Sequence, residues 1–138
     1  MGLSSWVGDQ MQGLSVFPPL IIVAGVTLII SFLTELTSNT ATTQMVLPIL
    51  ASIAVAMKTH PLLLMIPAAL SASCAFMMPV ATPPNAIVFG SGRVKIGEMV
   101  KAGLLINIIG IVVVTTFFLL VGKAVFAIKT GVLPVWAQ

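Results

Sequence analysis

Two short polar segments interrupt an otherwise apolar sequence. The first, at residues 34–44, reads TELTSNTATTQ, and the second, at residues 81–86, reads ATPPNA. Where a helix ends, backbone carbonyls lose their partners, and where one begins, backbone N–H groups do. Such carbonyls, together with Ser, Thr and Asn oxygens, suit a hard cation such as Na⁺, whereas the N–H end suits an anion because the helix dipole is positive there. The residue types therefore predict that a cation and a carboxylate can be held side by side, although no Lys or Arg lies near either segment.

Helix capping is the alternative explanation for these residue types. Ser, Thr and Asn are also the residues that most often cap the N-termini of helices. Pro83 and Pro84 remove two backbone donors and disfavour helix at Thr82, so Asn85 can cap a short helix behind them. The density of polar groups in the first segment exceeds what capping alone needs, which favours binding.

The composition is that of an integral membrane protein. The chain is 59% hydrophobic and 7% charged, with a mean hydropathy of +1.20, whereas a soluble domain has about 25% charged residues. Its six Lys and Arg residues give a net charge of +3, but they are scattered, so we expect no nucleic-acid partner. The sequence shows no nucleophile with a base, no cluster of metal ligands and no phosphate-binding loop. We therefore expect neither an enzyme nor a cofactor.

The pairing of the two polar segments indicates a transporter. Within a bilayer the backbone must be helical unless it is buried in protein or lines a cavity. Paired interrupted segments are the main sequence signal of the substrate site in a secondary transporter, and such a site usually lies between two facing repeats. The sequence contains one set of these elements, so we expect a fragment or one half of an assembly.

The expected fold is all-α and integral to the membrane. The predicted segments are an interfacial helix at 1–17, a re-entrant helical hairpin at 18–58, a discontinuous transmembrane helix at 61–92, an amphipathic connector at 93–102, a complete transmembrane helix at 103–127 and a tail at 128–138. The hairpin is favoured because its apolar arms are shorter than the roughly 20 residues that a full span needs. The alternative is one or two ordinary spans with a loop in water. The discontinuous helix is expected to break at 81–86 and to continue at 87–90.

Glu35 is the only acidic residue that we expect at membrane depth, and it is a functional candidate for that reason. Its carboxyl group could take up a proton or add negative charge near a cation. It could also pair with hydroxyl groups or with a neighbouring helix. The sequence leaves both interpretations open.

Residues 72–88, ASCAFMMPVATPPNAIV, resemble the signature of the divalent anion/sodium symporter family, which contains the INDY-type dicarboxylate transporters and related citrate and sulfate carriers. Every fixed position of that signature is matched, by Ser73, Phe76, Pro79, Val80, Ala81, Asn85, Ile87 and Val88. The Ser38-Asn39-Thr40 tip resembles the second Ser-Asn-Thr motif of the family, and the order and spacing of the two motifs agree. The resemblance covers roughly residues 1–127, the later part of the C-terminal repeat.

The resemblance implies a site and a mechanism. The implied sodium ligands are Thr34, Ser38, Asn39 and a carbonyl near Ala81. The implied half of a carboxylate site consists of Ser38, Asn39, Thr40 and the Pro83 region. Apart from the resemblance, we expect Glu35, Thr37, Thr82 and Asn85 in supporting positions. The family has an inverted-repeat architecture, and its substrate-bearing domain moves like an elevator against a fixed scaffold. The resemblance also implies that the full-length protein is a homodimer.

We therefore expect the C-terminal part of a secondary transporter in the cell membrane that carries di- or tricarboxylates, such as succinate, together with sodium. A sulfate or other anion carrier, or a sodium-independent anion exchanger of the same family, is the first alternative. The second is a truncated or accessory membrane subunit without transport by itself, because the N-terminal hairpin and scaffold are missing from the sequence. The expected partners are the small anion, sodium as the coupling ion, the lipid bilayer and the missing N-terminal repeat.

Overall fold

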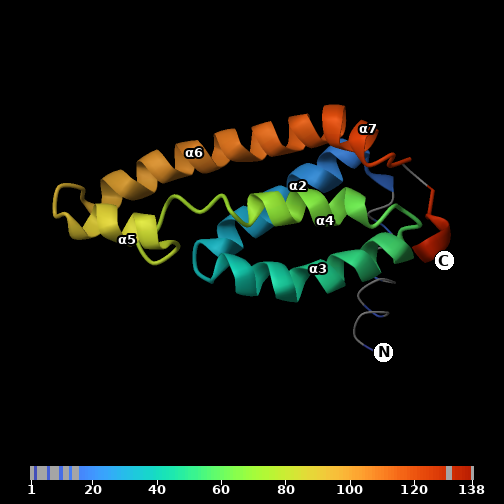
Figure 1. Cartoon of the computed structure of the whole chain (residues 1–138), viewed down its shortest axis with the longest axis horizontal. Helices are drawn as coiled ribbons and strands as arrows, with labels where there is room; N and C mark the ends of the chain where they lie inside the picture. The colour runs from blue at the N-terminus through green and yellow to red at the C-terminus, as the bar shows by residue number, and fades with distance from the viewer. Residues whose placement is uncertain are drawn as a thin grey trace.

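All regular structure in the described part of the chain is helical (Figure 1). The computed structural model describes residues 16–129 and 132–137 together with Gly2, Trp6, Gln10 and Gly13, so most of the predicted interfacial helix at 1–17 lies outside the described residues. The elements are α2 at Pro19–Thr34, α3 at Asn39–Ala56, α4 at Leu62–Ser71, α5 at Pro83–Gly90, α6 at Ile96–Phe117, the π-helical turn η2 at Phe118–Gly122, α7 at Lys123–Val125 and the 3-10 turn η3 at Val135–Ala137. The all-α class is confirmed. By length and composition, α3 and the continuous stretch Ile96–Val125 can each cross a membrane.

The first two helices form a hairpin whose tip is the polar segment. α2 begins at Pro19, where the fixed φ of proline suits the first helical turn. It ends at Thr34, residues 35–38 reverse the chain, and α3 begins at Asn39 with Ser38 as its N-cap. Figure 1 shows α3 returning antiparallel to α2. The tip therefore joins the C-terminus of one helix to the N-terminus of the next.

The second interruption is the non-helical segment between α4 and α5. It begins earlier than position 81, where the sequence predicts the break. α4 ends at Ser71, and residues 72–82 are non-helical until α5 begins at Pro83. The expectation that Pro83 and Pro84 end a helix is therefore corrected: they begin one, because proline is tolerated in the first turn, where its missing N–H would have no partner. The short helix expected at 87–90 is the second half of α5.

The last long helix also differs from the expectation. α6 begins at Ile96, inside the predicted connector at 93–102, and continues without a break into the predicted span at 103–127. The carboxylate of Glu98 accepts a hydrogen bond from the backbone N–H of Lys95, the N-cap, at 3.0 Å. Such a bond satisfies a donor that a helix start leaves unpaired, and it explains why the helix begins there.

Helix α2 packs against α3, α4 and α6 and so connects the parts of the fold. One apolar cluster joins α2 to α3 and α4 and consists of Ile30, Leu50, Ala54, Leu64, Ala68 and Ala72. A second joins α2 and α4 to the end of the long helix and consists of Val23, Leu63, Phe118 and Ile128. These clusters fix the two interrupted segments relative to each other.

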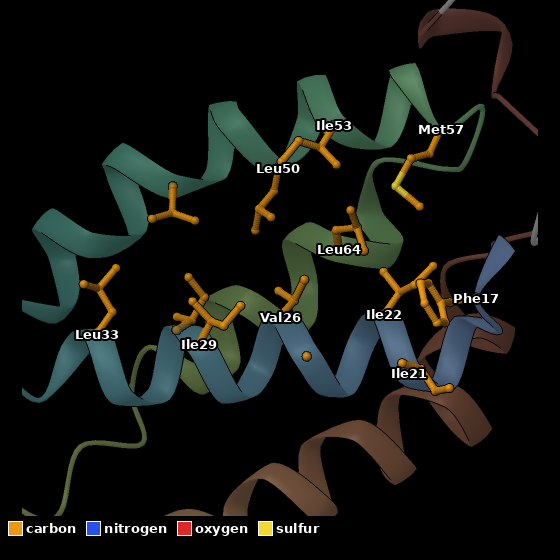
Figure 2. A pocket seen from close by; sticks show the side chains of 13 residues that line it. Phe17, Ile21, Ile22, Val26, Ile29, Leu33, Leu50, Ile53, Met57 and Leu64 are labelled. Carbon is orange, nitrogen blue, oxygen red and sulfur yellow. The ribbon is translucent and has the colours of Figure 1, made fainter. Parts of the chain in front are cut away.

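An apolar cavity of about 440 Å³ lies between α2 and α3. Figure 2 shows Ile22 and Val26 of α2 on one side and Leu50 and Ile53 of α3 on the other. An ion in this cavity would lose its hydration without gaining polar partners, which is strongly unfavourable. The apolar cavity is therefore no candidate for an ion or a carboxylate.

Candidate functional site

A second cavity, of about 680 Å³, brings the two polar segments together. The hairpin tip contributes Leu36, Thr37, Ser38, Asn39 and Thr40 to its wall. The second interruption and the start of α5 contribute Pro79, Val80, Ala81, Thr82, Pro83 and Ala86. The wall thus contains all the predicted substrate-binding residues and most of the predicted sodium ligands. Three predicted residues do not line the cavity: Thr34, Glu35 and Asn85.

The hairpin tip supplies hydrogen-bond donors to this polar cavity. The first N–H groups of α3 have no partner within the helix, and the side chain of its N-cap, Ser38, makes no capping hydrogen bond. Ser38 and Thr40 are exposed and Asn39 is half-buried, so their polar groups are accessible. The positive end of the α3 dipole lies at the same place. The start of α3 is therefore suited to an anion.

The second interruption supplies acceptors instead. Thr82 is the N-cap of α5. Pro83 and Pro84 have no N–H, and the N–H of Asn85 already donates to the Thr82 hydroxyl at 3.4 Å. The Ala81 carbonyl accepts no hydrogen bond from the residues that the structure describes. The two interruptions are therefore chemically different, whereas the sequence suggested that each supplies both donors and acceptors.

Thr34 connects the start of α3 to the start of the second interruption. It is fully buried, and its hydroxyl contacts Asn39 Oδ1 and also donates to the Ala72 carbonyl at 2.9 Å. A hydroxyl carries one proton, so three oxygen atoms share a single proton at this point. An oxygen cluster of this kind attracts positive charge.

Side chains of α2 also satisfy the backbone of the non-helical segment at 72–82. The Ser31 hydroxyl donates to the Cys74 carbonyl at 3.0 Å, close to the bond that Thr34 makes with Ala72. Each backbone group that is buried without a hydrogen-bond partner costs several kcal/mol. These bonds therefore allow the segment to remain non-helical.

Asn85 contributes to the same segment from the other side. Its side-chain amide donates to the Ala75 and Met78 carbonyls at 2.8 and 3.0 Å. The expectation that Asn85 caps α5 is thus corrected, because Thr82 is the N-cap and the Asn85 side chain folds back on the preceding residues. Asn85 supports the shape of the cavity wall without being part of it.

The Glu35 carboxylate lies behind the cavity and binds N–H groups. Its hydrogen-bond donors are the backbone N–H groups of Phe76, Met77 and Met78 and the side-chain amide of Asn107. Glu35 is 3% exposed. Of the two interpretations of this residue, the contacts favour pairing within the protein, here with backbone and with a neighbouring helix.

Comparison with known proteins identifies the family of the chain. The family model described as the sodium:sulfate symporter transmembrane region matches residues 1–128. The chain belongs to this family. The resemblance found in the signature and in the tip is thereby confirmed, as is the expectation of an integral membrane protein from a transport family and not from a family of enzymes.

Several curated relatives match this symporter-family chain closely. The sodium-dependent dicarboxylate transporter SdcS of Staphylococcus saprophyticus is 53% identical over 113 residues, which are 82% of this chain and 22% of the relative. The Na(+)/dicarboxylate cotransporter 3 of Rattus norvegicus is 44% identical over 137 residues, 99% of this chain and 22% of the relative. Solute carrier family 13 member 2 of Mus musculus is 48% identical over 136 residues, 99% of this chain and 23% of the relative. The chain thus spans less than a quarter of the length of these relatives.

Two helix faces in this symporter-family chain hold the site in place, and neither was predicted from the sequence. Polar residues recur on one face of α2, at Thr27, Ser31, Thr34 and Glu35, and all four are buried. Every fourth residue of α6 is buried from Met99 to Thr115. The two faces meet where the Thr27 and Thr115 hydroxyls lie 3.2 Å apart. Their helical spacing in otherwise apolar sequence is a signal that could have revealed them.

Proposed function

We propose that this chain forms one half of the binding site of a secondary active transporter that carries di- or tricarboxylates, such as succinate, together with sodium. The observation that carries the proposal is the polar cavity, which is shared by the hairpin tip and the second interruption. In secondary transporters, half-helix N-termini face the anionic groups of the substrate, and unwound carbonyls coordinate the coupling ion. The names of two relatives, a sodium-dependent dicarboxylate transporter and a Na(+)/dicarboxylate cotransporter, support the same substrate class.

The sodium ion would lie between the tip and the Ala81 carbonyl, which accepts no hydrogen bond from the described part of the chain. Its ligands would come from Thr34, Ser38, Asn39 and Ala81. The oxygen cluster around the Thr34 hydroxyl supports this placement, because it holds more oxygen atoms than protons. Thr37 would act by bracing the tip, since its hydroxyl donates to the Leu33 carbonyl at 2.9 Å.

One carboxylate of the substrate would lie at the start of α3. Ser38, Asn39 and Thr40 would donate hydrogen bonds to it, and the Pro83 region would form the facing wall. The sodium ion beside it would provide the positive charge that no Lys or Arg supplies among the residues of this wall. The second carboxylate would need ligands from the other repeat.

The finer architecture is part of the same proposal. The hairpin of α2 and α3 would be re-entrant, α4 and α5 would be the halves of one discontinuous transmembrane helix, and Ile96–Val125 would span the bilayer. The assembly would be an inverted-repeat elevator in the cell membrane, and the full-length protein would be a homodimer. Sulfate is the second candidate substrate, because the matching family model names it and because hydroxyl and N–H donors suit it equally well.

Uptake of radiolabelled succinate into vesicles tests this function. The assay compares sodium with choline, for this chain alone and for the full-length protein that contains it. We expect sodium-dependent uptake by the full-length protein only, and competition by unlabelled dicarboxylates. Uptake that is equal in choline would contradict sodium coupling, and competition by sulfate but not by succinate would shift the assignment to sulfate. Sodium-dependent uptake by the chain alone would contradict the need for a second half.

A further inference from the structure

Glu35 occupies a position where a carboxylate on its own is unfavourable. It is the C-cap of α2, and a helix C-terminus carries partial negative charge, which disfavours an anion. It is also almost fully buried, and burial penalises a charged group strongly. A carboxylate at this position therefore needs specific partners.

Three consecutive backbone N–H groups provide these partners. The N–H of Phe76 lies 2.8 Å from the carboxylate, that of Met77 lies 3.0 and 3.1 Å from its two oxygens, and that of Met78 lies 3.0 Å away. Successive N–H groups that point the same way form a concavity that binds anions. Here the anion is the protein's own carboxylate. The next residue is Pro79, where the second interruption enters the wall of the polar cavity.

Asn107 of α6 holds the same carboxylate from the opposite side. Its side-chain N–H donates to Glu35 Oε1 at 2.6 Å. The side chain is fully buried, and its Oδ1 has no partner among the described residues. A buried acceptor without a partner is destabilising, so the described residues around Asn107 satisfy its N–H donor and leave its oxygen acceptor unsatisfied. The orientation that the amide adopts is the one that serves Glu35.

Gly103 lies one helical turn before Asn107. Because it has no side chain, α6 can approach the backbone of Phe76 and Met77 closely. A Cβ at this position would overlap the Phe76 carbonyl and lie 2.5 Å from the Met77 Cα. The backbone of residues 76 and 77 therefore lies directly against α6, and the N–H groups of residues 76–78 donate to Glu35.

We propose that Glu35, oriented by Asn107, is a positioning residue that sets the second interruption against the hairpin tip. Glu35 immediately precedes the tip residues Leu36 to Thr40, and its carboxylate holds the residues that lead into Pro79–Pro83. One side chain thereby connects the two halves of the polar cavity. It touches neither the ion nor the substrate. The inference rests on the proposed function, because the site that Glu35 positions is the proposed sodium and carboxylate site.

The first test is Glu35→Gln in the full-length protein. Glutamine keeps the size of the side chain but removes the charge and turns an N–H group toward backbone donors. We expect the half-saturating concentrations of sodium and succinate to rise together by about 10–100-fold, as for residues that orient ion ligands from outside the coordination shell. Glu98→Gln is the matched control. Like Glu35, Glu98 accepts a hydrogen bond from the backbone, here from a single N–H group, but its side chain is exposed and it does not line the cavity. It should leave both values unchanged.

A second variant keeps the inference testable if Glu35→Gln does not fold. Asn107→Leu removes one of the four donor groups of Glu35 together with the unpaired acceptor, so we expect a folded protein with severalfold higher half-saturating concentrations. Thr115→Val is its control, because Thr115 lies two turns further along the same face and bonds Thr27 instead. That variant should reduce thermal stability and leave the half-saturating concentrations unchanged. Equal effects of the two variants on these concentrations would overturn the positioning role.

Hydrogen exchange gives a readout that does not depend on transport. In Glu35→Gln or Asn107→Leu, peptides that cover residues 72–82 should exchange faster than in the wild type, whereas peptides from α3 should not change. Faster exchange throughout the protein would overturn the inference in favour of general destabilisation. If the wild type takes up no anion in a sodium-dependent way, the proposed function fails, and the exchange pattern still decides whether Glu35 positions the segment.

Discussion

Asn39→Ala is expected to raise the half-saturating sodium concentration for succinate uptake by about 10–100-fold, the usual effect of disturbing the environment of a bound metal ion. Asn39 is the first residue of α3 and lies in the wall of the polar cavity. Its Oδ1 also contacts the Thr34 hydroxyl behind that wall. Alanine therefore removes an oxygen from the proposed sodium site and a donor from the proposed carboxylate site in one step.

Gln44→Ala is the matched control for this variant. Gln44 carries the same carboxamide on the same helix, but it is exposed and does not line the polar cavity. Sodium titrations of uptake, corrected for the amount of protein in the membrane, should leave Gln44→Ala at the wild-type value. If Asn39→Ala also keeps the wild-type sodium dependence and affinity, Asn39 is not a ligand.

The second large effect is expected for Gly103→Ala. The added Cβ would overlap the Phe76 carbonyl, which is backbone and cannot rotate away as a side chain can. Forcing extra volume into a packed site costs about 1–3 kcal/mol, and more where the backbone must move. Because residues 76–78 lead into the cavity wall, we expect both a lower melting temperature and a loss of sodium-dependent uptake.

Gly97→Ala serves as the control on the same helix. A Cβ at Gly97 would meet no atom within 4 Å, and alanine is a better helix former than glycine by about 1 kcal/mol. Thermal unfolding in detergent should therefore show an unchanged or slightly higher melting temperature. A Gly103→Ala protein as stable as Gly97→Ala would mean that α6 does not approach the non-helical segment as described.

The residues that line the polar cavity were easier to predict from the sequence than the residues that support its walls. The polar tip and the Ala81–Pro83 region could be recognised because hydroxyls, an amide and prolines are conspicuous between apolar helices. Their convergence on one cavity followed from the pairing of interrupted segments. The position at which the second interruption starts could not be predicted in the same way. Local propensity lets an apolar run such as 61–80 continue as helix, and α4 ends at Ser71 only where side chains distant in sequence can bond the freed backbone.

Glu35 illustrates the same limit. It was a candidate because it is the only acidic residue expected at membrane depth. Its hydrogen-bond partners, however, are the backbone of residues 76–78 and the side chain of Asn107, which come close to it only when the chain folds. Three of the four donor groups are backbone N–H groups, and any sequence contains these. The role of the carboxylate was therefore not predictable from residue types. The regular spacing of polar residues on α2 was the available hint.

Thiol protection can show whether the hairpin tip and the second interruption form one binding site. Leu36 and Val80 line the polar cavity from the two segments, and neither is a proposed ligand. Each would be replaced by cysteine, as Leu36→Cys and Val80→Cys, in a cysteine-free form of the full-length protein, and labelled with a maleimide. Ser91→Cys, an exposed position beyond α5, is the control. We predict that succinate with sodium slows labelling at both cavity positions, that succinate with choline slows neither, and that the control is unaffected. Protection at only one of the two cavity positions would contradict a shared site.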